Sequence, residues 1–172
     1  MNALIKNQIN SCFLLLGSNI GNRYDYLSKA LRMINEKGGT FISKSSVYET
    51  EPCGFVSNDY FLNMVVELST GRTPGEILIM IKTIEKTLGR SRTSGKYLSR
   101  TIDIDILFYN ELTLQQPDLI IPHPLIPERR FILEPMHEIA PGFSHPVLHK
   151  TVARLLKECT DLSEVKKVSL FL

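Results

Sequence analysis

Residues 101–108, TIDIDILF, alternate between apolar and acidic side chains, and this period of two residues restricts the fold more than any other feature of the chain. Such alternation is typical of a β-strand with one face in the core. We expect Phe108 and the three isoleucines of this segment to point into the core. Asp103 and Asp105 then share the opposite face, about 6.6–6.8 Å apart along the backbone.

Two carboxylates held this close repel each other, and their apolar neighbours leave them poorly solvated. A hard divalent cation removes both costs, and Mg²⁺ favours one or two carboxylates together with phosphate oxygens. Such a pair can hold two ions about 3.5–4 Å apart, the spacing used for in-line phosphoryl displacement. The pattern leaves open a plainer alternative, in which this strand face is wet and both acids are solvated.

The rest of the chain shows strand and helix patterns in turn. Strands are expected at 13–16, 40–48 and 61–68, and helices from Tyr24 to Gly38, from Thr73 to Leu88 and from Thr151 to Cys159. The second helix has the clearest start, since Thr73, Pro74 and Glu76 match a capping box. The order β-α-β-β-α-β, followed by a proline-rich segment and a C-terminal helix, predicts an α+β fold with a ferredoxin-like (βαββαβ) antiparallel sheet and helices packed on it.

The composition is that of one globular domain. The chain has 172 residues, of which 43% are hydrophobic, and its formal net charge is +2. This charge is too small to indicate nucleic acid or an acidic membrane as a partner. Three scattered cysteines and a polar N-terminus without a signal peptide favour the cytoplasm. We expect a single domain at 12–160, short tails at 1–11 and 161–172, and no membrane-spanning segment.

A basic segment, GRSRTSGKYLSR at 89–100, directly precedes the acidic strand. Its cationic residues are Arg90, Arg92, Lys96 and Arg100. Beside a carboxylate pair, such a segment suggests a polyphosphate that bridges the two kinds of charge. The segment is not a P-loop, because Tyr97 stands where serine or threonine is required. A solvated positive loop is the alternative.

Other side chains are candidates for holding a planar ring. Phe61 and Asn63 share a strand face, and Phe131 follows two arginines. An aromatic side chain stacks on a heterocycle, and an amide reads its hydrogen-bonding edge, although core packing is the commoner role of a lone phenylalanine. His123, between two prolines, suits a fixed polar contact or a rigid exposed turn equally well.

Many segments occur in an order and spacing that match one known family. They are LLLGSNIGN at 14–22, SVYETEPCG at 46–54, YFLN at 60–63, IEKTLGR at 84–90, SRTIDIDIL at 99–107, IPHP at 121–124, RRFILEP at 129–135 and EIAP at 138–141. Together they resemble the 6-hydroxymethyl-7,8-dihydropterin pyrophosphokinase family of folate biosynthesis, from about Phe13 to Cys159. One departure is Tyr97-Leu98-Ser99, where the family usually has Trp-Gly-Pro, so closure of this loop can differ.

The resemblance implies an ATP-dependent pyrophosphokinase (a diphosphotransferase) that transfers pyrophosphate from ATP to the pterin hydroxymethyl group and releases AMP. It assigns two Mg²⁺ ions to Asp103 and Asp105, and a catalytic role to both and to Arg90 and Arg100. It assigns the pterin to Thr50, Pro52, Cys53, Phe61, Asn63 and Phe131. It assigns ATP to Glu85, Arg90, Arg92, Lys96, Tyr97, Arg100, His123 and Arg129.

Two other classes of function stay open at this stage. One is a different two-metal nucleotidyl- or phosphotransferase on a ferredoxin-like fold, which needs no pocket built from Asn63 and Phe131. The other is a non-catalytic ligand-sensing module, which would form no AMP from ATP. In the favoured interpretation the protein is a monomer whose partners are small-molecule substrates.

Overall fold

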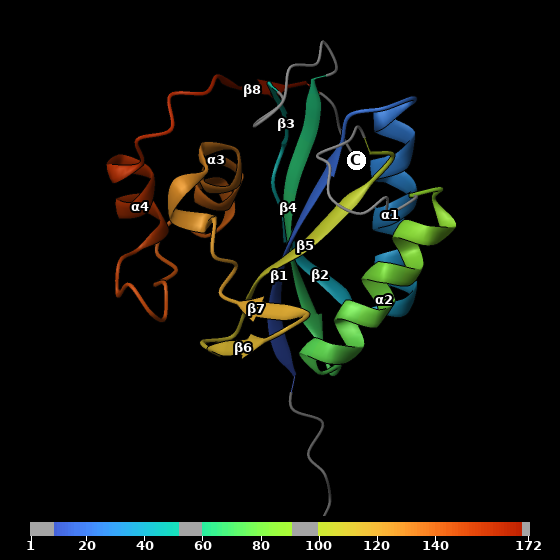
Figure 1. Ribbon diagram of the computed structural model, residues 1–172, viewed down its shortest axis with the longest axis horizontal. Helices are drawn as coiled ribbons and strands as arrows, with labels where there is room; N and C mark the ends of the chain where they lie inside the picture. Colours follow the sequence, from blue (N-terminus) through green and yellow to red (C-terminus); the bar gives the residue numbers. More distant parts are fainter. Residues whose placement is uncertain (1–8, 52–59, 91–99, 170–172) are drawn as a thin grey trace, which may run out of the picture.

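An antiparallel sheet organises the chain in the computed structural model, which describes residues 9–51, 60–90 and 100–169 (Figure 1). Its strands are β1 (Asn10–Ser18), β2 (Thr40–Lys44), β3 (Val47–Thr50), β4 (Phe61–Thr70), β5 (Asp103–Tyr109) and β8 (Val165–Val168). The strand order is β5-β1-β4-β3-β8, with β2 also paired to β4. The four strand segments of the βαββαβ unit thus lie in the order fourth, first, third, second, in which β2 and β3 together form the second segment. This is the ferredoxin-like arrangement that the sequence predicted.

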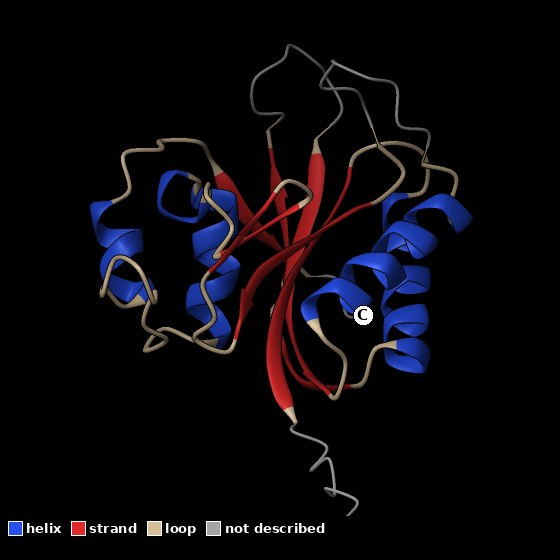
Figure 2. Cartoon of the chain, turned by 60° about the horizontal axis from the view of Figure 1, so that its bottom comes forward, coloured by secondary structure: helices blue, strands red, loops and turns tan. Residues whose placement is uncertain are grey.

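Helices cover both faces of this sheet (Figures 1 and 2). One face carries α1 (Arg23–Lys37) and α2 (Pro74–Thr87); the other carries α3 (Arg130–Ile139) and α4 (Val152–Glu158). A small hairpin of β6 (Leu114–Gln116) and β7 (Leu119–Ile121), followed by the 3₁₀ helix η1 (Ile126–Glu128), links β5 to α3. The predicted capping box at the start of α2 is present, with Thr73 and Glu76 bonding reciprocally.

Alternation along the strands divides the core between the two faces. In β1, Leu14 and Leu16 pack toward α1 and α2, while Phe13 and Leu15 belong to the core under α3 and α4. Strand β4 repeats the division, since Met64 lies in the first core and its neighbour Val65 in the second. Because both faces are buried, functional side chains reach solvent mainly near the ends and edges of the sheet.

Phe108 is buried in the core, as expected, but on the opposite face of the sheet from the three isoleucines. The ring lies in the second core, 4.7 Å from Phe143 between centroids, whereas Ile104 and Ile106 lie in the first. The β1–β5 register shifts at a bulge, so that Leu14 faces Ile106 while Phe13 faces Phe108. The extra residue in β5 reverses the alternation from that point onward.

Three further elements differ from the expectation. The segment 40–48 divides into β2 and the start of β3. No helix was expected in the proline-rich segment, but α3 lies there and contains Pro135. Residues 165–168, in the expected C-terminal tail, form β8 and pair with β3.

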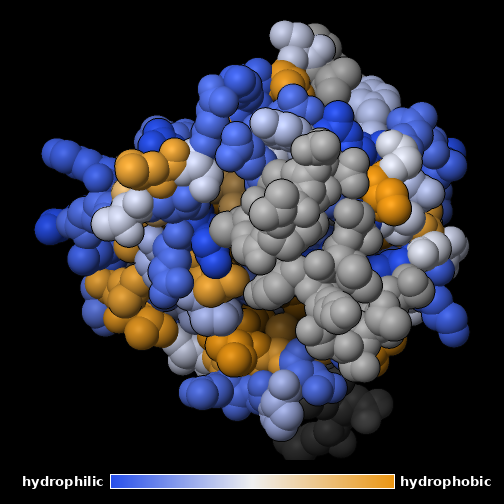
Figure 3. Space-filling model, turned by 45° about the horizontal axis from the view of Figure 1, so that its top comes forward, coloured by the Kyte–Doolittle hydropathy of each residue, from blue (hydrophilic) through white to orange (hydrophobic). Residues whose placement is uncertain are grey.

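Within the described residues, no helix combines the length and hydropathy that a membrane span requires. On the face shown in Figure 3, the coloured surface is mainly hydrophilic, and apolar side chains form separate patches.

Candidate active site

The two aspartates of β5 lie on the sheet face that α3 and α4 cover. Asp105 is directly opposite Leu15 in the β1–β5 ladder, and Asp103 is opposite Gly17. Residues directly opposite each other share a face, and Leu15 belongs to the second core. The alternation that places Ile104 in the first core therefore places both carboxylates together on the other side.

Asp103 is held by two guanidinium groups. Arg90 Nη1 contacts Asp103 Oδ1 and also Glu85 Oε1, while Arg100 Nη1 contacts Asp103 Oδ2. The side chain of Glu85 is only 2% exposed. Its Oε1 also accepts a hydrogen bond from the Ile104 backbone N–H at 3.0 Å. Glu85 therefore joins α2 and Arg90 to the edge strand that carries both aspartates.

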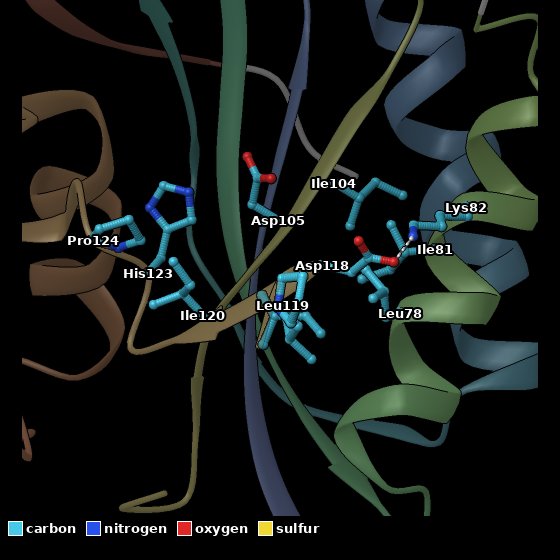
Figure 4. A pocket seen from close by; sticks show the side chains of 12 residues that line it. Leu78, Ile81, Lys82, Ile104, Asp105, Asp118, Leu119, Ile120, His123 and Pro124 are labelled. Carbon is cyan, nitrogen blue, oxygen red and sulfur yellow. Dashed lines mark ion pairs between the residues drawn. The ribbon is translucent and has the colours of Figure 1, made fainter. Parts of the chain in front are cut away.

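Asp105 faces His123 instead, and Figure 4 shows the imidazole beside the carboxylate. Burial raises the pKa of the Asp105 carboxyl, an effect that the charge of His123 opposes. Burial lowers the pKa of the His123 imidazole, and the negative charge of Asp105 opposes this effect by raising it. The His123 backbone N–H donates to Leu107 O at 3.0 Å, which fixes the histidine against β5. Asp105 and His123 are therefore largely shielded from water, and burial disfavours the charged form of each side chain.

A pocket of about 460 Å³ opens next to these two residues, between α2 and the β6–β7 hairpin (Figure 4). Its apolar lining comprises Leu78, Ile81, Ile104, Ile106, Pro117, Leu119, Ile120 and Pro124. Lys82 Nζ and Asp118 Oδ2, also part of the lining, form an ion pair of 3.8 Å. Apolar walls with a few convergent polar groups are typical of a small-molecule site.

The amide candidate lies across β1 from the acids. Asn63, in β4, is directly opposite Gly17, which is itself opposite Asp103 in β5. Asn63 and Asp103 are thus two strand spacings apart, about 10 Å. Asn63 is 4% exposed, and its Nδ2 donates to Thr50 Oγ1 at 2.7 Å. The amide is therefore held in one orientation by a buried hydroxyl.

Gly17 leaves the sheet surface between these two groups without a side chain. A Cβ atom at this position would lie 2.8 Å from Asn63 Oδ1 and 3.8 Å from Phe61 Cδ1. Any larger residue would displace the amide or fill the space between the amide and the acids. The glycine is therefore part of the candidate site, although it was not among the predicted site residues.

The remaining candidates divide into placed and undescribed residues. Phe61 shares the strand face of Asn63, and Phe131, in α3, packs against the second core. Arg129 directly precedes α3. Pro52, Cys53, Arg92, Lys96 and Tyr97 lie outside the described residues.

Asn19, Lys82 and Asp118 also lie at the candidate site, although none of them was among the predicted site residues. Asn19 is buried, and it exchanges hydrogen bonds with the Arg100 backbone, its N–H donating at 3.1 Å and its Oδ1 accepting at 2.6 Å. This exchange ties the end of β1 to the entry of β5. The GSN motif after an apolar strand was a usable signal for Asn19, but nothing in the sequence brings Lys82 near Asp118.

Metal binding at the aspartates can be judged from the donors present. Within the described ranges, no group of three or more His, Cys, Asp or Glu side chains could enclose an ion. Asp103 and Asp105 provide hard oxygen donors of the type that Mg²⁺ prefers, with further positions left for phosphate and water. The donor set fits magnesium carried with a nucleotide and does not fit a structural zinc site.

Comparison with known proteins agrees with this geometry. A family model described as 7,8-dihydro-6-hydroxymethylpterin-pyrophosphokinase (HPPK) matches residues 13–141. The chain belongs to this family. All the acidic, amide and guanidinium groups described above lie within the part that matches HPPK.

Curated relatives named 2-amino-4-hydroxy-6-hydroxymethyldihydropteridine pyrophosphokinase cover most of the chain. The protein of Bacillus subtilis is 41% identical over 131 residues, which are 76% of this chain and 78% of the relative. That of Porphyromonas gingivalis is 43% identical over 137 residues, 78% of this chain and 92% of the relative. That of Aquifex aeolicus is 38% identical over 149 residues, 86% of this chain and 91% of the relative.

Solved structures support the fold. A Plasmodium falciparum HPPK-DHPS crystal structure superposes with a TM-score of 0.75 at 22% identity, covering 90% of this chain and 46% of that one. The chain therefore spans less than half the length of that protein. The similarity confirms the ferredoxin-like fold that the strand order shows.

Proposed function

We propose that this protein transfers pyrophosphate from ATP to the hydroxymethyl group of 6-hydroxymethyl-7,8-dihydropterin, a step of folate biosynthesis, and releases AMP. Family membership supports the reaction class. The observation that carries the proposal is the arrangement across β1, where Gly17 separates the Asn63 amide from Asp103. A pterin read by the amide and a polyphosphate beside the acids would meet above the glycine.

The nucleotide base is proposed to occupy the pocket between α2 and the β6–β7 hairpin. Its apolar walls suit a purine, and Asp105 and His123 belong to its lining. A triphosphate leading from Asp105 would pass along β5 toward Arg90 and Arg100. Guanidinium groups bind phosphate oxygens in the same bidentate manner in which they bind carboxylate oxygens. Both arginines can therefore replace their contact with Asp103 by a contact with the nucleotide phosphates.

Asp103 and Asp105 would hold two Mg²⁺ ions together with the phosphates. When bound, these ions would neutralise charge on the transferred group. The chain itself supplies positioning: Arg90 and Arg100 fix the phosphates, and β5 fixes the acids. Phosphoryl transfer depends mainly on such positioning and charge compensation, and little on covalent participation by the protein.

The pterin is proposed to lie on the Asn63 side of Gly17. The Asn63 amide would read the hydrogen-bonding edge of the ring, and Thr50 would keep the amide oriented. Phe61 and Phe131 would stack on its two faces. The hydroxymethyl oxygen would then point across Gly17 toward the β-phosphorus, as in-line attack requires. A cytoplasmic monomer that acts only on small molecules is part of the same proposal.

The test is release of AMP from ATP, measured with and without 6-hydroxymethyl-7,8-dihydropterin. AMP should form only when both the pterin and Mg²⁺ are present. Asp105→Ala should abolish the reaction, whereas Glu111→Ala, which removes an exposed carboxylate after β5, should leave it unchanged. ADP as the product, or AMP release that ignores the pterin, would refute the proposal.

A further inference from the structure

Strand β8 lies outside the part of the chain that matches the family model. That match ends at residue 141, whereas β8 comprises Val165–Val168. It pairs antiparallel with β3, from Val47 opposite Val168 to Thr50 opposite Val165. Strand β8 therefore covers the edge of the sheet opposite to β5 (Figure 1).

The strand that β8 covers is short and ends at a residue of the candidate pterin site. Strand β3 has four residues, and its last is Thr50, whose hydroxyl accepts from the Asn63 amide. Thr50 is opposite Phe61 on one side and Val165 on the other. The ends of short edge strands fray readily because half of their backbone groups lack a partner. Pairing with β8 gives a partner to the outward-directed backbone groups of β3, including those of Glu49 next to Thr50.

A single carboxylate fastens β8 to the elements beside it. Glu138, in α3, accepts from Lys167 Nζ at 2.8 Å and from Tyr48 Oη at 3.0 Å. It also accepts from the backbone N–H and the hydroxyl of Ser46, each at 2.8 Å. Strands β3 and β8 and helix α3, which carries Phe131, therefore meet at one side chain.

We propose that β8 is a positioning element for the pterin: it fixes Thr50, and through Thr50 it fixes the amide of Asn63. This inference rests on the proposed function. The nucleotide pocket is built on β5, α2 and the β6–β7 hairpin, near the opposite edge of the sheet. Loosening β8 should therefore weaken pterin binding selectively.

The ladder indicates which residue of β8 to change. The backbone N–H of Ile104 points away from β1 toward Glu85, so the pair of Ile104 with its partner in β1 is not hydrogen-bonded. Hydrogen-bonded and non-hydrogen-bonded pairs alternate along an antiparallel ladder. When this alternation is applied in turn to the β1–β4, β4–β3 and β3–β8 ladders, Lys166 and Glu49 form a hydrogen-bonded pair, and the N–H of Lys166 points toward Glu49. Proline at 166 would remove that donor.

The experiment compares Lys166→Pro with Lys166→Ala in the full chain. Both variants lose a side chain whose partner is the exposed Glu164, but only proline removes the N–H. Dissociation constants are measured for the pterin and for a non-hydrolysable ATP analogue with Mg²⁺. Lys166→Pro should raise the dissociation constant of the pterin about tenfold, which is the effect of losing one or two hydrogen bonds. The dissociation constant of the nucleotide should stay within about twofold of the wild-type value. Lys166→Ala should bind both like the wild type.

Lys167→Ala is the second variant, because it removes only the contact with Glu138 and keeps the ladder. It should raise the dissociation constant of the pterin about two- to threefold. If the proline variant does not fold, this variant tests whether β8 positions the pterin site. Unchanged pterin affinity in the folded variants, or equal weakening of both ligands, would overturn the inference. The wild-type AMP assay separates this outcome from failure of the proposed function.

Discussion

Gly17 lies directly opposite Asn63 in the β1–β4 ladder, and a Cβ atom on the glycine would approach the amide oxygen to 2.8 Å. The same glycine is opposite Asp103 on its other side. One residue without a side chain thus separates the group proposed to read the pterin from the acids proposed to receive the phosphates.

Gly17→Ala should weaken binding of the pterin but not binding of the nucleotide. The added methyl group displaces the Asn63 amide from Thr50, and loss of that oriented hydrogen bond should raise the pterin KM about tenfold. Nucleotide affinity should remain within about twofold, since the pocket for the base lies beyond β5. Gly71→Ala is the matched control, because its Cβ atom would have no neighbour within 4 Å. Steady-state kinetics with each substrate varied in turn would distinguish the two variants.

Asp105→Asn should lose turnover without loss of stability. Burial raises the pKa of Asp105 above the ordinary value of 3.8, so its ionisation costs stability, which begins to be lost as the pH rises above the unfolded pKa and is fully lost above the folded pKa. A neutral amide removes this cost, and urea unfolding at neutral pH should show equal or greater stability. Turnover should fall at least about a hundredfold. A destabilised but active variant would contradict this assignment.

Asp103→Asn should behave differently, because Asp103 accepts from both Arg90 and Arg100. The substitution removes the carboxylate that both partly buried guanidinium groups contact, although Arg90 keeps its contact with Glu85, and this loss should cost about 1–3 kcal/mol. Urea unfolding without metal or nucleotide measures this cost. Stability equal to that of Asp105→Asn would show that the arginines do not depend on Asp103.

Glu138 should make the fold sensitive to acid. Burial raises the pKa of Glu138, but the contacts with Lys167, Ser46 and Tyr48 together outweigh this effect and lower the pKa to about 2, below the ordinary value of 4.5. The stabilisation is therefore present above the unfolded pKa and is lost as the pH falls from about 4.5 toward 2. Glu138→Gln should reduce the slope of unfolding free energy against pH in this window. An unchanged slope would show that other carboxylates control acid unfolding.

Most of the sheet could be predicted from hydrophobic periodicity, since β1, β4 and β5 are long and strongly patterned. The bulge could not, because the register shift between β1 and β5 depends on which residues meet across the ladder. Pro135 concealed α3, since a proline inside a helix removes a donor and argues for a break. Burial of Leu133 and Met136 on the same helix compensates for this loss.

The placement of Asp103 and Asp105 on one strand face could be predicted because they are two residues apart in an alternating segment. Partnerships across the fold could not be predicted from residue patterns. The Asn63–Thr50 bond and the exchange between Asn19 and Arg100 join segments whose contact depends on strand order. Strand β8 was not foreseen either, because VKKV has only two apolar residues.

The most direct test of the account is a crystal structure with Mn²⁺ in place of Mg²⁺, a non-hydrolysable ATP analogue and the pterin, in which anomalous scattering locates the ions. The account predicts two manganese peaks at the carboxylates of Asp103 and Asp105, with the pterin on the Asn63 side of Gly17. Anomalous peaks elsewhere, or carboxylates that contact no ion while the nucleotide is bound, would contradict it.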